Sequence, residues 1–415
     1  MSNLLDKASI ILTPTAYNTS EVLCVKPSDG TGDFDFLRAT EATRVNSLGL
    51  IETIGINLPR INYEGGCGSW LFEPQSTNLF DYSEDFSDSF WTKDVATISS
   101  NSIISPDGTQ NASTLVSSNT TSQQLIKGSF SVISGNDYTV SFFAKKKDFD
   151  YIQIRFEGRG APFQAGGVWF NIDNGTLGTQ ETGYTGTITD YGNGWYRCTS
   201  TATATSSATA TIRVQLASSD NSSTIVGNGT DGTYIWGAQT EALSYPTSYI
   251  PTSGSTVTRN KGLCTNGGSL ASINSPEGVL YIEAAALAAI TEERRIVLSN
   301  GTNTYRVIIR ITAPDTIKFF VGVVSNQASH TATGVVTTNF NRMAISWKEN
   351  DIRFYLNGTN IFTDTSSNPF PADTLNILNF SSPDGSSNPF FGKTKCAAIW
   401  KEALTDAELI SLTTL

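Results

Sequence analysis

Two aromatic residues flanked by glycines are the candidates for stacking on a sugar ring. Trp169 lies in the run Gly-Gly-Val-Trp-Phe, and Tyr184 lies in the run Thr-Gly-Tyr-Thr-Gly. Glycines let a ligand or another backbone approach closely, and an aromatic ring can stack on the apolar face of a pyranose. Gln153 and Arg155 alternate nearby and could bind sugar hydroxyls, so these four residues predict a shallow glycan-binding face. The alternative is ordinary strand and loop packing, or contact between subunits.

Residues that could support acid-base or metal chemistry are scarce. The chain has one histidine, His330, in the polar run Asn-Gln-Ala-Ser-His-Thr. This context favours a solvated loop histidine over a catalytic one, because no partner residues with matching spacing accompany it. The five cysteines are scattered and include no Cys-x-x-Cys pair, which argues against a zinc site and against a disulfide framework. We therefore predict no catalytic residues and no metal-binding residues.

The composition excludes several classes of partner. The 415 residues include 27 Lys and Arg against 38 Asp and Glu, which gives a net charge of −11. Binding to phosphate backbones needs clustered cations, so we expect no nucleic-acid partner. The N-terminus has no cationic segment followed by an apolar core, and no apolar run approaches about 18 residues. We therefore expect neither a signal peptide nor membrane insertion.

The elements that must position these residues are strands. Short β-branched and aromatic runs, bounded by Gly, Asn, Asp and Pro, recur about every 8–12 residues, which is typical of sandwiches and jelly rolls. Residues 151–156 and 208–216 alternate between apolar and polar as half-buried strands do. The pair Asn357-Gly358 predicts a tight hairpin turn within residues 351–362. The predicted fold class is therefore all-β.

Clusters of turn residues divide the chain into three parts. Residues 1–64 form an attachment or assembly segment with few core-forming runs, and we expect it to gain order by packing on the next domain or on another chain. Residues 65–262 and 263–415 are each long enough to form a β-sandwich with its own core. Near the end, Glu408 follows Thr405 in a capping-box pattern, so a short C-terminal helix is expected.

Three motifs in the N-terminal part belong to one pattern. Residues 38–46 read Arg-Ala-Thr-Glu-Ala-Thr-Arg-Val-Asn, residues 58–63 read Leu-Pro-Arg-Ile-Asn-Tyr, and residues 71–79 read Leu-Phe-Glu-Pro-Gln-Ser-Thr-Asn-Leu. Together they resemble the leader of a family of bacteriophage and prophage virion proteins, mostly tail-fibre-like or other appendage components. In that family the leader precedes a jelly roll similar to carbohydrate-binding modules.

The rest of the chain continues the resemblance. Residues 192–197 and 234–241 resemble the jelly roll, and residues 345–347 with residues 399–409 resemble a laminin-G or concanavalin A-like domain. The resemblance implies a virion structural protein, as a fibre, tail appendage or capsid decoration, which is made in the bacterial host cytoplasm and assembles with other virion subunits. It further implies a homotrimer that presents its two jelly rolls to host-surface or environmental glycans. Weak sites on such an assembly gain avidity from copy number.

The resemblance also suggests two further possibilities, a catalytic function and a bound calcium ion. Concanavalin-like folds include glucanases, which place two carboxylates in one cleft through a Glu-x-Asp-x-x-Glu strand. No such run occurs, and the nearest acidic clusters are Glu84-Asp85 with Asp88 and Glu292-Glu293. A virion-borne glycan-degrading enzyme and a purely architectural subunit are the alternatives. Many such modules hold a structural Ca²⁺, but residues 235–238 read Ile-Trp-Gly-Ala where an acidic pair is common, so no cofactor is expected.

Overall fold

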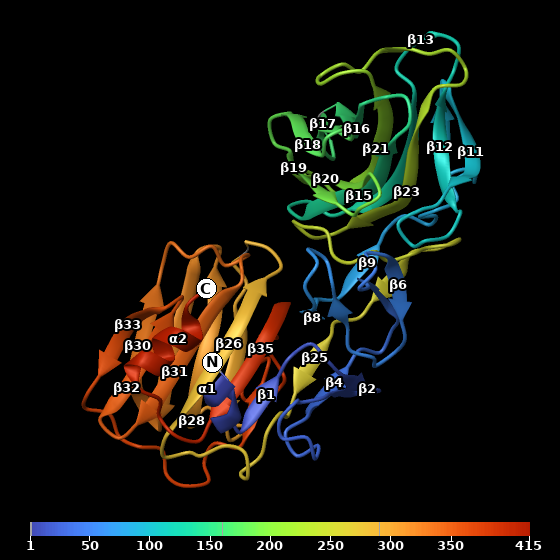
Figure 1. The fold of residues 1–415 in the computed structure, drawn as a ribbon. Helices are drawn as coiled ribbons and strands as arrows, with labels where there is room; N and C mark the ends of the chain where they lie inside the picture. Colours follow the sequence, from blue (N-terminus) through green and yellow to red (C-terminus); the bar gives the residue numbers. More distant parts are fainter. Residues whose placement is uncertain (1, 160, 290) are drawn as a thin grey trace. The chain divides into compact units, whose positions relative to one another are not determined.

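The computed structural model describes residues 2–159, 161–289 and 291–415, and strands dominate it (Figure 1). Half of the residues lie in strands and 3% in helices, so the prediction of an all-β fold is confirmed. Contacts divide the chain into two compact units. Unit 1 contains Met1–Glu41, Ile54–Pro74 and Asn260–Leu415, and unit 2 contains Ala42–Thr53 and Gln75–Arg259.

These units differ from the three predicted ranges, because the leader is shared between them. β1 (Ile10–Leu12) pairs antiparallel with β35 (Gly392–Trp400), close to the other end of the chain. β8 (Ser69–Phe72) pairs with β35 as well, so residues just beyond 64 also belong to unit 1. The physical reason is burial, since the apolar residues of the leader that are fully or nearly fully buried in the core of unit 1 include Ile10, Leu12, Val22, Phe34 and Phe36.

Unit 1 is a sandwich of an eight-stranded sheet and a five-stranded sheet, with one hydrophobic core built from both. The path of the eight-stranded sheet is β33 (Thr359–Asp364), β32 (Asp351–Leu356), β31 (Asn341–Lys348), β26 (Gly278–Ala286), β35, β8 and β7 (Ile61–Asn62), and β1 also pairs with β35. The five-stranded sheet contains β30 (Ser325–Ala332), β29 (Thr316–Val323), β28 (Tyr305–Ala313), β27 (Arg294–Ser299) and β34 (Ile377–Asn379).

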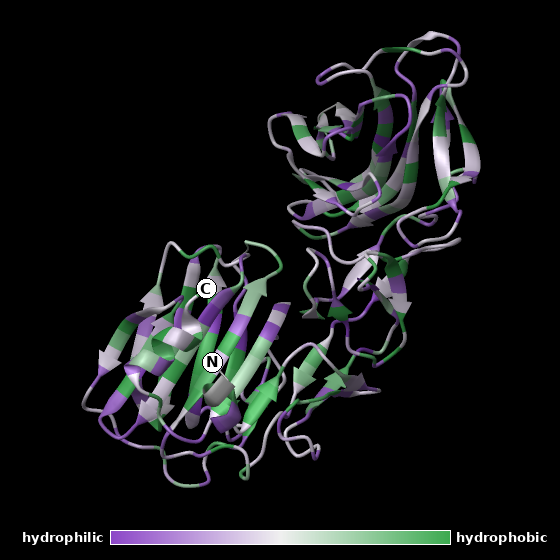
Figure 2. Ribbon diagram, in the orientation of Figure 1, coloured by the Kyte–Doolittle hydropathy of each residue, from purple (hydrophilic) through white to green (hydrophobic). Residues whose placement is uncertain are grey.

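Two short helices pack on the outer face of the eight-stranded sheet. They are α1 (Ser2–Lys7) and α2 (Asp406–Thr413), and Leu409 of α2 is buried in a cluster with residues of β26, β31, β32 and β35. The predicted capping box is confirmed, because the Thr405 hydroxyl accepts from the Glu408 backbone N–H and the Glu408 carboxylate accepts from the Thr405 backbone N–H. β26 is consequently buried on both faces, and Figure 2 shows hydrophobic colour along most of it.

Unit 2 is a sandwich of two six-stranded antiparallel sheets, which we name by a central strand of each. The β16 sheet contains, in order, β10 (Thr92–Asp94), β14 (Leu125–Val132), β21 (Ala208–Ala217), β16 (Tyr151–Arg159), β17 (Gln164–Asn171) and β18 (Thr176–Gln180). The β15 sheet contains β11 (Ala96–Ile103), β12 (Ala112–Ser117), β23 (Gly232–Glu241), β15 (Asp137–Lys146), β20 (Trp195–Thr203) and β19 (Thr185–Asp190). The second hydrophobic core of the molecule is built from both sheets. The predicted strands at 151–156 and 208–216 lie in β16 and β21.

Short ribbons complete the two units. They are the four-stranded sheet β2 (Tyr17–Asn18), β3 (Glu21–Val22), β4 (Phe34–Leu37) and β25 (Leu263–Thr265), and the pairs β5 (Ala42–Val45) with β6 (Ile51–Ile54), β9 (Ser76–Asn78) with β24 (Val257–Arg259), and β13 (Thr121–Ser122) with β22 (Ile225–Val226). The predicted hairpin turn joins β32 and β33, with φ of 48° at Asn357 and 83° at Gly358. His330, expected in a solvated loop, lies instead in β30, because this polar run pairs with β29 as an edge strand.

Candidate functional site

The outer face of the β16 sheet carries polar side chains and one tryptophan in a row. Side chains alternate along a strand, and Ile152 and Ile154 belong to the core of unit 2, so Gln153 points away from that core. The register places Gln215 of β21 opposite Gln153 on one side and Trp169 of β17 opposite it on the other. The row therefore crosses three neighbouring strands, and Figure 1 shows β21, β16 and β17 side by side.

The row is buried, and its side-chain polar groups make no hydrogen bonds among the residues that the structure describes. Gln153 and Gln215 are fully buried, and Trp169 is 3% exposed. Among the described residues, neither side-chain amide nor the indole N–H has a hydrogen-bond partner. A buried polar group without a partner costs about 1–3 kcal/mol. The row thus holds donors and acceptors that a polar ligand would satisfy.

Residues 218–224, which we call the cover loop, reach from the edge strand β18 to the residues just before β14, and the strands that carry the row lie between these two. Asp220 accepts hydrogen bonds from the Thr179 backbone N–H at 2.7 Å and from the Thr179 hydroxyl at 2.9 Å, and Thr179 lies on the edge strand β18. The Ser223 hydroxyl accepts from the Gln123 side-chain amide at 3.1 Å, just before β14. The loop is therefore held at both sides of the strands that carry the row.

A cleft of about 610 Å³ opens on the same face, beside the row. It is lined by Arg155, Glu157, Gly158, Ala161, Pro162, Ala165, Thr209, Thr211 and Arg213. An Arg155 Nη1 lies 2.7 Å from a Glu181 carboxylate oxygen, and an Arg213 Nη1 lies 3.7 Å from a Glu157 carboxylate oxygen. Burial lowers the pKa of Arg213, and the neighbouring Arg155 lowers it further. Guanidinium, carboxylate and hydroxyl groups thus converge in this cleft.

Three of the four residues predicted for the glycan face share the outer face of the β16 sheet, but Tyr184 does not. Tyr184 is 6% exposed and belongs to the core, with its ring 5.5 Å from that of Phe156. Its hydroxyl donates to the Gln164 carbonyl, and burial raises its pKa to about 12. The expectation of an exposed ring at this position is therefore corrected, because the ring fills space inside the sandwich.

The glycines near Trp169 lie in close contact with other parts of the protein. A Cβ at Gly166 would lie 2.4 Å from a ring carbon of Tyr184, and a Cβ at Gly167 would lie 2.1 Å from the Ile154 carbonyl oxygen. Close approach by the protein's own ring and backbone explains these glycines, as the alternative interpretation of the sequence stated. Trp169 is likewise buried, at 3% exposed, and is not an open platform.

Gln215, Arg213 and Glu157 were not among the predicted site residues. For Arg213 and Gln215, alternation with apolar residues was visible in the sequence, and it placed both on the polar face of their strand. Only the cross-strand register shows that Gln215 lies opposite Gln153 and Arg213 opposite Arg155. A single sequence contains no signal for that register.

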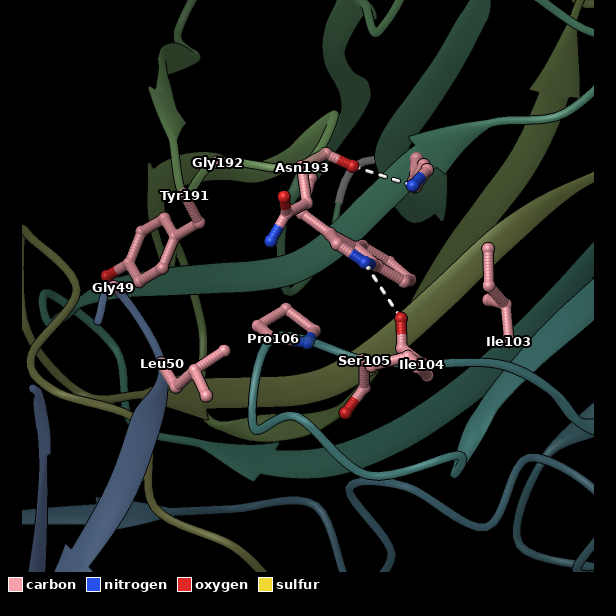
Figure 3. A pocket seen from close by; sticks show the side chains of 11 residues that line it. Gly49, Leu50, Ile103, Ile104, Ser105, Pro106, Tyr191, Gly192 and Asn193 are labelled. Atoms are coloured by element: carbon pink, nitrogen blue, oxygen red, sulfur yellow. Dashed lines mark hydrogen bonds between the residues drawn. The ribbon is translucent and has the colours of Figure 1, made fainter.

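A second, smaller pocket of about 300 Å³ lies elsewhere on unit 2 (Figure 3). Its lining includes Leu50, Pro106 and Tyr191. The Trp195 indole donates to the Ile104 carbonyl at 3.1 Å, and the Lys145 ammonium donates to the Asn193 carbonyl at 2.6 Å. These donors are paired with the protein's own backbone, so this mainly apolar pocket is a weaker candidate for binding a sugar.

The acidic clusters considered for catalysis have structural contacts. Asp85 and Asp88 each accept a hydrogen bond from the backbone N–H two residues further on, as side chains in turns do. Glu84 accepts from the Tyr249 hydroxyl at 2.9 Å, and Glu293 lies 2.5 Å from an Arg295 nitrogen. Glu84, Asp85, Asp88 and Glu293 thus take part in hydrogen bonds of turns, in a hydrogen bond from a tyrosine and in an ion pair.

Neither a metal-binding cluster nor a membrane-spanning helix occurs in residues 2–159, 161–289 and 291–415. Over these ranges, no group of three or more His, Cys, Asp and Glu side chains could hold a metal ion, and no helix is long and apolar enough to cross a membrane. Trp236, in the segment where calcium-binding modules often carry acidic residues, packs with its ring 5.2 Å from Phe143 and 4.6 Å from Tyr249.

One part of the chain matches a known family of domains. Residues 286–410 match the Laminin_G_3 model, which is described as the concanavalin A-like lectin/glucanases superfamily. This match and the observed sandwich define a concanavalin A-like domain in unit 1. No curated protein matches the chain.

Several solved structures are similar to the chain at low identity. The CBM40 module of the Ruminococcus gnavus IT-sialidase, bound to alpha2,3 sialyllactose, is 16% identical with a TM-score of 0.31, over 36% of this chain and 93% of that module. A putative carbohydrate binding protein from Bacteroides ovatus is 13% identical with a TM-score of 0.28, over 70% of this chain and 80% of its own. The SAP-like pentraxin of Limulus polyphemus is 11% identical with a TM-score of 0.30, over 35% of this chain and 72% of its own.

Proposed function

We propose that the chain is a glycan-binding protein and that the outer face of the β16 sheet binds the glycan. The observation that carries this proposal is the pair of buried side-chain amides, Gln153 and Gln215, which have no partners among the described residues and lie beside the cleft that Arg155 and Arg213 line. Sugar hydroxyls both donate and accept hydrogen bonds, so amide, guanidinium and carboxylate groups all suit them. Trp169 adds an aromatic surface at the end of the row.

Access to the row requires the cover loop to open. The loop is held by hydrogen bonds from Thr179 to Asp220 and from Gln123 to Ser223, and these bonds are exposed to solvent. Such bonds each contribute about 0.5–1.5 kcal/mol, so opening has a modest cost. Opening extends the cleft into one polar surface from Trp169 to Gln215.

We further propose that the protein is a virion structural protein of a bacteriophage, acting as a fibre, tail appendage or capsid decoration. The leader motifs at residues 38–46, 58–63 and 71–79 support this role through their resemblance to virion appendage proteins. In this proposal the chain is made in the bacterial host cytoplasm, forms homotrimers and assembles with other virion subunits. Several weak glycan sites on one particle then give strong attachment to a host surface. Mass spectrometry of purified particles tests the virion role, and the absence of the chain from them contradicts it.

A glycan array probed with the full chain tests the binding proposal. We expect selective binding, and we expect Arg213→Gln to weaken it by about tenfold, because a hydrogen bond to a charged group contributes about 1.5–3 kcal/mol. Arg44→Gln is the matched control, since Arg44 is a partly buried arginine of unit 2 that pairs with Glu52 away from the cleft. A folded chain that binds no glycan, or an Arg213→Gln variant that binds as the wild type does, overturns the proposal.

A further inference from the structure

The outer face of the five-stranded sheet in unit 1 carries a row of cations. Arg295 lies opposite Arg310, and Arg310 lies opposite Lys318, on the neighbouring strands β27, β28 and β29. The residues on either side of each in the sequence are buried, so these three side chains point outward. Neighbouring strands lie about 4.8 Å apart, so the three charges follow each other closely across the sheet.

Repulsion among these three cations lowers the stability of unit 1, and nearby carboxylate charge offsets it only in part. Like charges directly opposite each other destabilise a sheet. One carboxylate contacts the row, since the Glu293 carboxylate lies 2.5 Å from an Arg295 nitrogen and 3.3 Å from an Arg310 nitrogen. No salt bridge to Lys318 is found within the described ranges. The row therefore keeps excess positive charge on a chain whose net charge is −11.

A fourth cation lies on the same face and shares an aromatic ring with the row. The guanidinium carbons of Arg306 and Arg310 lie 4.9 Å and 5.7 Å from the ring centroid of Phe320. Cation–π contacts hold both guanidinium groups at this ring. Burial lowers the pKa of Arg306, and the nearby charges of Arg310 and Arg295 lower it further. Arg306 has no ion pair with a carboxylate among the residues that the structure describes, and its Nε is buried without a partner.

We propose that this face, formed by Arg295, Arg306, Arg310, Lys318 and Phe320, binds an acidic saccharide that carries carboxylate or sulfate groups. Guanidinium groups bind such oxyanions with paired, charge-assisted hydrogen bonds. On β30, Ser329 lies opposite Phe320 and Thr331 lies opposite Lys318, so hydroxyls that suit a sugar border the cations. Four cations partnered by one carboxylate make the face complementary to a negatively charged ligand.

The choice of a saccharide over another anion rests on the proposed glycan-binding function, whereas the cationic face does not depend on the cleft of unit 2. A nucleic acid is a poorer match, because it presents a dense ladder of phosphates that a chain of net charge −11 repels outside this small face. An acidic polysaccharide carries its charges on separate sugar units, and the hydroxyls between them have Ser329 and Thr331 as partners.

Three dextrans of equal length test the inference with the full chain: unmodified dextran, carboxymethyl dextran and dextran sulfate. We expect the two acidic polymers to bind at least about tenfold more tightly than dextran, with binding that weakens as salt is added. The double variant Arg310→Gln/Lys318→Gln should lose about tenfold or more of this affinity. Arg310→Lys should lose less, because it keeps the charge but not the paired hydrogen bonds of the guanidinium group. Lys348→Gln/Lys395→Gln is the charge-matched control, since both lysines lie on strands of the other sheet, β31 and β35. Thermal unfolding of each variant confirms that it is folded.

Each outcome decides the inference. Equal binding of acidic and neutral dextran, or an unchanged affinity in the double variant, overturns it. Single-stranded DNA that binds as tightly as dextran sulfate, and loses binding in the same variant, overturns the assignment to a saccharide. The unit 2 variant Arg213→Gln should leave the acidic-dextran affinity unchanged. If only the unit 2 proposal is wrong, the chain will bind no glycan on the array but will still prefer acidic dextran. If only the present inference is wrong, the chain will bind the array but will not prefer acidic dextran.

Discussion

Gln153 and Gln215 lie opposite each other on the antiparallel strands β16 and β21, both fully buried, and neither side-chain amide has a hydrogen-bond partner among the described residues. A pair like this lowers stability unless something else binds it. Natural sequences keep such costs mainly where function requires them. Replacing this pair therefore distinguishes a binding role from a structural role, because the two roles predict different changes in stability and in glycan affinity.

Replacing both amides should separate stability from binding. In Gln153→Leu/Gln215→Leu, apolar side chains of similar size replace groups that lack partners, so the free energy of unfolding should stay equal or rise by about 1–3 kcal/mol. Glycan affinity should fall by about tenfold or more because the hydrogen-bonding groups are gone. Urea unfolding and array binding check the two parts. A variant that is strongly destabilised while it keeps its glycan affinity would show that the amides serve the fold.

A buried ion pair should be essential to unit 1. Arg60 and Glu73 are 1% and 3% exposed, and an Arg60 Nη1 lies 2.7 Å from a carboxylate oxygen of Glu73. Arg60→Met leaves the Glu73 charge buried without this partner, which should cost about 3–5 kcal/mol. The double variant Arg60→Met/Glu73→Leu should recover most of that loss. Urea unfolding of the three proteins checks this, and equal stability of the single and double variants would contradict it.

Part of the fold followed directly from the sequence. Alternation predicted the strands at 151–156 and 208–216, and the capping box of Thr405 and Glu408 predicted α2. These features depend on residues within a few positions of each other, so a single sequence contains the information. The short pairing of β1 with β35 joins residues almost 400 positions apart, and no local pattern reports it.

The site was less predictable for the same reason. Alternation assigned Gln153 and Arg155 to a polar face, which the structure confirms, but it could not report that Gln153 is fully buried. Glycines beside Tyr184 suggested an open ring, whereas the ring packs against Phe156 inside the sandwich. Local glycine patterns show that something approaches closely, and only the tertiary structure shows what it is.

The stability of unit 2 should depend on the protonation of Glu84. Burial raises the pKa of Glu84 above its ordinary value of 4.5, the hydrogen bond from Tyr249 opposes this shift, and the nearby Asp107 adds to it. The folded state then binds more protons than the unfolded state between these two pKa values, so this group lowers the free energy of unfolding as pH rises through that window. Glu84→Gln removes the contribution and should gain stability relative to the wild type as pH rises. Urea unfolding across the window checks this, and a difference that is constant with pH would contradict it.

Thiol reactivity should single out one cysteine. Cys67 is exposed, whereas Cys198 and Cys264 are buried and burial raises the pKa of both. Burial also raises the pKa of Cys24 and of Cys396 to about 12. Because the thiolate is the reactive form, native protein at about pH 8 should react with Ellman's reagent rapidly at Cys67 alone. Cys67→Ser should abolish the fast phase, and a fast phase that persists in this variant would contradict the packing described.

A crystal structure of the full chain bound to the strongest glycan from the array tests the central claim most directly. The account predicts a sugar on the outer face of the β16 sheet, with its hydroxyls within hydrogen-bond distance of the side-chain amides of Gln153 or Gln215 and with the cover loop displaced. A sugar bound elsewhere, with residues 218–224 still closed over the row, would contradict it.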